Sequence, residues 1–169
     1  MKNERGRFIY TKIKKIIFKG KQNIQWKSVE EYMRKYIGEN YVVKEYGDSI
    51  KINYDSASEF AGSIYSEKLR GGLAKTKANI VQIIPDLIIN ATNRRWVENK
   101  DEKHNDNASG GWYRYDVFFS IPVQAEKEIE IRWNYYKATM VVKINAKGLF
   151  FYDIINIKKE ARTPGGSSK

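Results

Sequence analysis

The chain has 169 residues, with 31 Lys and Arg against 20 Asp and Glu, which gives a formal net charge of +11 at pH 7. It has no cysteine and one histidine, His104, which excludes disulfide frameworks, thiolate zinc sites, cysteine nucleophiles and mechanisms that need two imidazoles. A hydrophobic fraction of 41% excludes disorder throughout. Because no apolar run approaches the roughly 18 residues of a membrane span, and the first residues lack the apolar stretch of a signal peptide, we expect a cytoplasmic protein.

Basic residues gather near the start of the chain. Residues 1–36 hold eleven Lys and Arg against three Glu, and aromatic residues are interleaved with them. Basic side chains bind phosphates, and aromatic rings can stack on unpaired bases. The pattern predicts a nucleic-acid partner; it does not itself distinguish RNA from DNA, and we expect RNA over DNA. The alternative is a solvated basic segment that only aids solubility.

The first part of the chain holds one segment of ambiguous secondary structure and one clear helix start. Residues 7–19 mix apolar and basic positions and fit a strand or a short amphipathic helix equally well. Ser28 and Glu31 have the spacing of a capping box, which predicts a helix that continues to about Ile37 and stops at Gly38.

Turn and cap residues organise the next segment. Residues 41–54 predict two short strands around a turn at Gly47 and Asp48. Asp55 or Ser56 is expected to cap the following helix, which Gly71 and Gly72 end or interrupt.

The second half of the chain changes from helical to strand periodicity. Residues 73–91 have a helical apolar face, and Pro85 is expected to kink or split that helix. Residues 97–111 predict a long exposed loop. The four strand candidates that follow are 112–123, 128–136, 138–146 and 149–159, with a hairpin turn at Lys147 and Gly148.

This order predicts an α+β fold in which helices precede a four-stranded antiparallel β-meander and pack on one of its faces. We divide the chain into a basic N-terminal helical or strand extension (1–49), an α+β core domain (50–160) and a flexible tail (161–169).

Three stretches carry a family resemblance: SIYSEKLRGGLAKTKANIVQIIPDLIINA (63–91), WYRYDVFFSIPV after the polar loop, and ATMVVKINAKG with LFFYDI. Over about residues 50–159 the chain resembles a domain of large polyvalent proteins of phages and conjugative elements. The organisation of that domain is similar to the Barnase–EndoU–colicin–RelE-like (BECR) group. The resemblance implies helices before a four-stranded antiparallel sheet. It also implies a role in a mobile element, a toxin or an anti-defence system, with a possible host or cognate protein partner.

Metal-independent RNA cleavage needs a base, an acid and cations near the phosphate. With one histidine, a RelE-like set of Lys, Arg and Tyr is the version open to this chain, and no cofactor or metal is expected. The catalytic candidates are Lys75, Lys77, His104, Arg132 and Tyr136. The nucleic-acid-binding candidates are Lys12, Lys14, Lys15, Lys68, Arg70, Arg94, Arg95, Trp96, Tyr113 and Lys143. A wider pool adds Ser66, Arg114, Tyr115 and Tyr135.

Each candidate also has a structural interpretation. The lysines of residues 68–77 fit a solvated helix face as well as a phosphate clamp, and His104 fits an inert loop residue. We expect Trp96 to close the core and the adjacent arginines to stay at the surface.

One motif is treated as a chance match. Asp86 followed by Glu98 and Lys100 fits the PD-(D/E)xK pattern of metal nucleases. That chemistry needs the two carboxylates to converge on Mg²⁺ from adjacent strands. Here the Asp lies in a helical segment and the Glu opens a loop, so we expect no metal site.

Two function classes remain. A metal-independent endoribonuclease predicts a cationic cleft between the helices and the polar sheet face, with at least two of Lys75, Lys77, Arg132 and Tyr136 in it. A non-enzymatic module that binds nucleic acid or inhibits a host defence protein predicts a broad basic surface without a converging acid and base.

Overall fold

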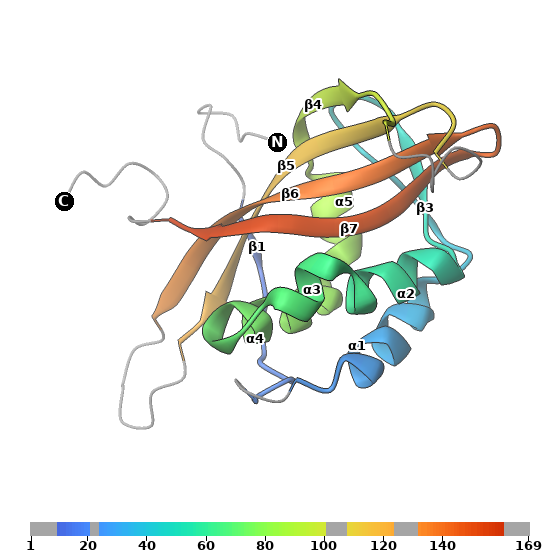
Figure 1. Cartoon of the computed structure of the whole chain (residues 1–169). Helices are drawn as coiled ribbons and strands as arrows, with labels where there is room; N and C mark the ends of the chain where they lie inside the picture. Colours follow the sequence, from blue (N-terminus) through green and yellow to red (C-terminus); the bar gives the residue numbers. More distant parts are fainter. Residues whose placement is uncertain (1–9, 21–23, 101–107, 124–131, 161–169) are drawn as a thin grey trace.

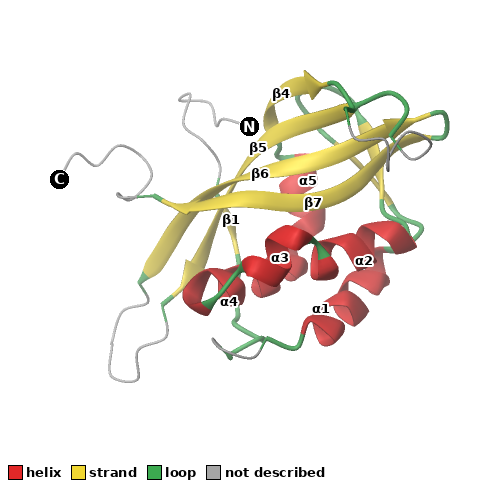
Figure 2. Cartoon of the chain, viewed as in Figure 1, coloured by secondary structure: helices red, strands yellow, loops and turns green. Residues whose placement is uncertain are grey.

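The computed structural model describes residues 10–20, 24–100, 108–123 and 132–160. The strands are β1 (Thr11–Lys12), β2 (Asn40–Val42), β3 (Ser49–Lys51), β4 (Thr92–Val97), β5 (Trp112–Pro122), β6 (Trp133–Asn145) and β7 (Gly148–Lys159). The α-helices are α1 (Trp26–Met33), α2 (Tyr54–Gly62), α3 (Ile64–Lys68), α4 (Gly71–Ile80) and α5 (Ile84–Ile89), and two 3₁₀ turns follow α1 and α4. One curled, seven-stranded sheet of order β1-β5-β6-β7-β3-β2, with β4 also paired to β5, lies over the helical layer (Figures 1 and 2).

The predicted four-stranded antiparallel meander is wrong, although the chain is α+β. The sheet is mixed, because β1 pairs in parallel with β5 and β3 in parallel with β7. The predicted strands 128–136 and 138–146 do not form two strands, since β6 runs unbroken from Trp133 to Asn145, and residues 128–131 lie outside the described residues. The reason is that one alternation continues through position 137, so that Tyr136 and Ala138 both face the core.

The described residues between 10 and 49 contribute strands to the sheet and side chains to its core. Ile13, Ile16, Val29, Met33 and Val43 are all buried in the core cluster. The carboxamide of Asn79 on α4 ties the segment after β1 to the helices. It accepts hydrogen bonds from the backbone N–H groups of Ile17 (2.9 Å) and Phe18 (3.1 Å) and donates one to the Phe18 carbonyl (2.9 Å). The basic positions between the core residues point to solvent, which explains the mixed pattern of this segment.

Two helix starts differ from the prediction. In α1, the backbone N–H groups of Ser28 and Val29 donate to the Gln25 carbonyl, so Ser28 lies inside the first turn and is not the N-cap. In α2, the cap is Asn53, whose side chain accepts from the Ser56 N–H while the Ser56 hydroxyl accepts from the Asn53 N–H. Position 56 is therefore the third helical residue and completes the capping box.

The predicted break near Pro85 and the predicted turns at Gly47 and Lys147 are confirmed. The predicted helix 73–91 is split into α4, a 3₁₀ turn and α5, with Pro85 in the first turn of α5. The strands β2 and β3 form an antiparallel pair around Gly47, which has φ +76°. The hairpin between β6 and β7 turns at Lys147, with Asn145 paired to Gly148.

Candidate functional site

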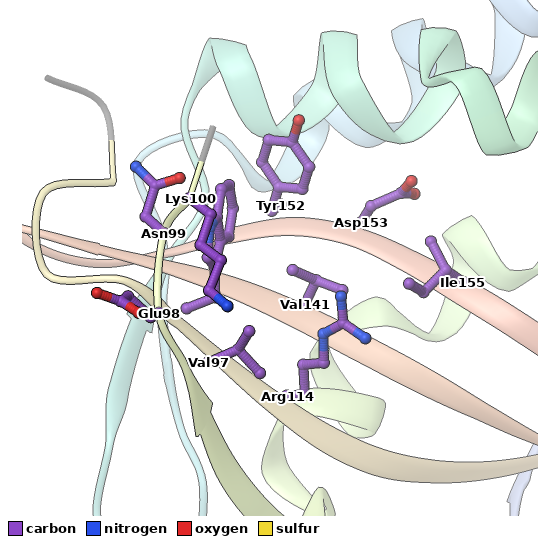
Figure 3. A pocket seen from close by; sticks show the side chains of 10 residues that line it. Val97, Glu98, Asn99, Lys100, Arg114, Val141, Tyr152, Asp153 and Ile155 are labelled. Carbon is purple, nitrogen blue, oxygen red and sulfur yellow. The ribbon is translucent and has the colours of Figure 1, made fainter. Parts of the chain in front are cut away.

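The face of the sheet that is turned away from the helices, here called the outer face, carries polar side chains. Along β5, Tyr113 and Tyr115 pack against the core, so the alternate residues Trp112, Arg114 and Asp116 lie on the outer face. A cavity of about 340 Å³, the outer-face pocket, opens there (Figure 3). It is lined by Val97, Glu98, Asn99, Lys100, Trp112, Arg114, Val141, Tyr152, Asp153 and Ile155.

The charged side chains that line the outer-face pocket differ in orientation. The guanidinium of Arg114 and the ammonium of Lys100 point into it, whereas the carboxylates of Glu98 and Asp153 point away (Figure 3). The Arg114 Nε atom is buried and has no hydrogen-bond partner in the described part of the chain. A buried donor without an acceptor is costly, so the pocket is suited to an anionic acceptor.

The register neighbour of Arg114 on β4 behaves differently. Arg95 lies opposite Arg114, and its Nη1 atom is 3.1 Å from the Asp116 carboxylate. That carboxylate also accepts a hydrogen bond from Asn93 (2.8 Å) and lies 3.7 Å from the Lys137 ammonium. These two arginines, paired across β4 and β5, therefore differ, because among the described residues an acidic partner engages Arg95 and none engages Arg114.

Two aromatic side chains form a wall of the pocket. Trp112 and Tyr152 pack edge to face, with ring centroids 4.7 Å apart. Gly111 brings the preceding loop close to β4: its φ is +85°, and a Cβ there would lie 2.7 Å from the Trp96 Nε1 atom and from the Val97 carbonyl. Only glycine meets both requirements, so Gly111 sets the position at which Trp112 enters the pocket.

Lys77, a predicted catalytic residue, is fully buried between α4, α3 and β7. Its Nζ atom lies 2.6 Å from the Asp153 carboxylate and 2.6 Å from the Ser66 hydroxyl, which in turn donates to the Phe60 carbonyl. Burial lowers the pKa of Lys77 and raises that of Asp153, and the attraction between the two charges opposes both shifts. This closed cluster joins α3, α4 and β7, which favours a structural role.

Two of the four residues predicted for a cleft between helices and sheet do meet. Lys75 and Tyr136 line a cavity of about 180 Å³ between α4 and the ends of β5 and β6. Arg132 is exposed just before β6 and does not line it, and His104 lies outside the described residues. None of the described residues that line this cavity is acidic.

The predicted binding residues are dispersed. Lys14, Lys15 and Lys68 are exposed, and the Lys12 ammonium lies 5.2 Å from the ring centroid of Trp133. Arg70 closes the end of α3 by donating to the carbonyls of Glu67 and Leu69. Lys143 is buried and lines a separate cavity, described below.

Trp96 does not close the core as predicted, and Arg94 occupies a partly covered position at the surface. Arg94 is held by Asp48 at 2.8 and 2.9 Å and lies over the rings of Tyr46 and Tyr113. Trp96 is 58% exposed, and its indole N–H donates to the Gly110 carbonyl (2.8 Å). Asp48 and the two tyrosines thus cover part of the Arg94 side chain, which stays 30% exposed, while Trp96 lies outside the core.

Trp112 and Tyr152 were not among the residues predicted from the sequence, and Arg114 stood only in the wider pool of candidates. The signal that could have found them is the alternation within the predicted strand 112–123, which places Trp112 beside Arg114 on one face. The metal-nuclease pattern does not assemble. Glu98 and Lys100 line the outer-face pocket, but Asp86 belongs to α5 and does not. In the described ranges no three His or acidic side chains cluster as a metal site would require.

Comparisons of the chain with protein-family models, with curated proteins and with solved structures found no match. Within the described segments, every helix is too short or too polar to cross a membrane.

Proposed function

We propose that the protein binds single-stranded nucleic acid, with RNA preferred to DNA, through the outer-face pocket. Arg114 and Lys100 hold a phosphate, and the wall of Trp112 and Tyr152 receives a base. The observation that carries the proposal is the buried Arg114 Nε donor, which has no partner among the described residues and belongs to a guanidinium that points into the pocket.

The chemistry of the lining fits this ligand. A guanidinium presents a planar fork of donors that matches a phosphate, and a nearby ammonium adds a second positive charge. Aromatic side chains stack on bases without reading their sequence, and they reach only bases that have left a duplex. The cavity volume of about 340 Å³ falls at the small end of ligand pockets, which favours one nucleotide unit over a paired segment.

The test is fluorescence anisotropy with labelled single-stranded RNA, single-stranded DNA and duplex, measured at low and moderate salt. Arg114→Gln is expected to weaken RNA binding about tenfold or more, because a charge-assisted contact is lost. Arg95→Gln is the matched control, since Arg95 lies opposite on β4 but is already paired with Asp116. Equal losses in both variants would mean that affinity follows overall charge and that the pocket is not the site.

The endoribonuclease interpretation stays a prediction. The meeting of Lys75 and Tyr136 in one cavity favours it. The carboxylates that point away from the outer-face pocket favour binding without cleavage. Incubation with labelled RNA, followed by a denaturing gel, separates the two interpretations. EDTA-resistant fragments that disappear with Tyr136→Phe would establish cleavage at that cavity. Intact RNA, with a salt-sensitive shift on a native gel, would leave a binding module.

A cytoplasmic location, a host or cognate protein partner and a role in a mobile element, toxin or anti-defence system also stay predictions.

A further inference from the structure

A second cavity lies where the β6–β7 hairpin meets the start of α2. Its volume is about 280 Å³, and it shares no lining residue with the outer-face pocket. We call it the hairpin pocket; it is lined by Asn53, Asp55, Ser109, Lys143, Asn145, Ala146, Lys147 and Phe150. Polar side chains from three separate parts of the chain therefore surround one small space.

Positive charge converges on the hairpin pocket. Lys143 is only 2% exposed, and its ammonium lies 5.8 Å from the ring centroid of Phe150. The Lys51 ammonium, from β3, lies 5.9 Å from the same ring, and Lys147 lines the cavity directly. Asp55 is the one acidic residue among the described lining residues, and its carboxylate is 3.7 Å from the Lys143 ammonium.

Lysines outnumber the acidic side chains around the hairpin pocket among the described residues. Burial lowers the pKa of Lys143, and the negative charges of Asp55 and Glu59 oppose that shift. Asp55 is itself exposed to solvent, with 75% of its side chain accessible, so water screens its attraction for the ammonium. Because Lys143 and Lys147 line the cavity, and the Lys51 ammonium lies near the same Phe150 ring as that of Lys143, an anion bound there would be attracted by all three charges.

We propose that the hairpin pocket binds a phosphoryl group, held by Lys143 and Lys147, with Lys51 beside it. Lysines act as point charges toward phosphate, and the small cavity suits an anion of the size of phosphate or pyrophosphate. The phosphoryl group comes either from a small phosphorylated molecule or from the backbone of a nucleic acid. The proposal does not depend on the function proposed for the outer-face pocket.

The probe is inorganic pyrophosphate, followed by isothermal titration calorimetry and by thermal unfolding. We expect saturable binding and a rise in Tm for the unchanged protein, and about tenfold weaker binding for Lys147→Gln and for Lys51→Gln. Lys143→Met is expected to abolish binding. If that variant fails to fold, the two exposed lysines still test the site. Lys44→Gln, another exposed lysine outside the pocket, is the control. Absence of binding to the unchanged protein, or equal weakening by Lys44→Gln, would overturn the proposal.

A competition experiment distinguishes the two sources of the phosphoryl group. If pyrophosphate displaces labelled RNA from the unchanged protein but not from Lys147→Gln, the pocket binds a backbone phosphate. If pyrophosphate binds without displacing RNA, the ligand is a separate phosphorylated molecule. The two proposals can also fail independently of each other. Arg114→Gln is expected to leave the affinity of the hairpin pocket for pyrophosphate unchanged.

Discussion

Replacing Lys77 with Met is expected to lower the free energy of unfolding by about 3–5 kcal/mol. Met keeps most of the aliphatic volume that packs near Phe60 and Tyr65, so the main change is the loss of the ammonium. The Asp153 carboxylate, whose side chain is 3% exposed, would then be left as a buried charge without its cation. The loss is a large part of the roughly 5–15 kcal/mol by which a typical domain is stable.

The measurement is urea unfolding followed by tryptophan fluorescence and circular dichroism. Asp153→Asn is expected to cost a similar amount, because it leaves the Lys77 ammonium buried. The double replacement Lys77→Met with Asp153→Leu removes both charges and should recover much of the loss, since a buried pair is often no more stabilising than apolar residues of similar size. A loss below about 1 kcal/mol in either single variant, the range of exposed ion pairs, would refute the reasoning and mean that water reaches the pair.

The two single variants should also respond to pH in opposite directions. In Lys77→Met, Asp153 loses the cation that opposes its raised pKa, so the folded state binds its proton more readily than the unfolded state does. The stability of this variant, relative to the unchanged protein, should rise as the pH falls below 7. In Asp153→Asn the pKa of Lys77 is lowered further, the unfolded state binds the extra proton, and stability should rise with pH toward 10. Each slope is at most about 1.4 kcal/mol per pH unit.

Two further replacements test how single residues position the chain. Asn79→Leu removes the carboxamide that bonds the backbone of Phe18, and it is expected to cost about 1–3 kcal/mol in urea unfolding and to speed limited proteolysis of the segment after β1. Gly111→Ala is expected to lower Tm and weaken RNA binding, because a Cβ there has 2.7 Å contacts and a φ of +85°. Gly72→Ala, in a helix with open space around the glycine, is the control and should be neutral or slightly stabilising.

Sequence patterns located the breaks in the chain better than the pairing of its strands. The turn at Gly47 and the division of the long helix at Pro85 follow from the conformations of single residues, so local reasoning found both. The short strands β1 and β2 hold only two and three residues and carry no alternation of their own. Their place in the sheet is set by contacts with distant strands, as in the parallel pairing of Thr11 with Phe119, which no local pattern contains.

The candidate site was harder to predict because a side chain's type does not reveal its partner. Arg94, Arg95 and Arg114 are alike in the sequence. The first is held by Asp48 from a turn 46 residues away, the second is paired with Asp116, and the third points into a pocket. Which arginine can contact a ligand therefore depends on where the fold places the aspartates.

The lysines of the basic N-terminal segment are likewise placed by the residues that pack around them. Ile13 and Ile16 are buried in the core, and Lys12, Lys14 and Lys15 occupy the positions left facing solvent. None of these lysines lines the outer-face pocket or the hairpin pocket. We expect their charge to act at longer range, by raising the rate at which a nucleic acid approaches and by making that rate sensitive to salt. If the pockets hold the phosphate as we propose, mutation of the segment is expected to change the association rate, and mutation of Arg114 the dissociation rate.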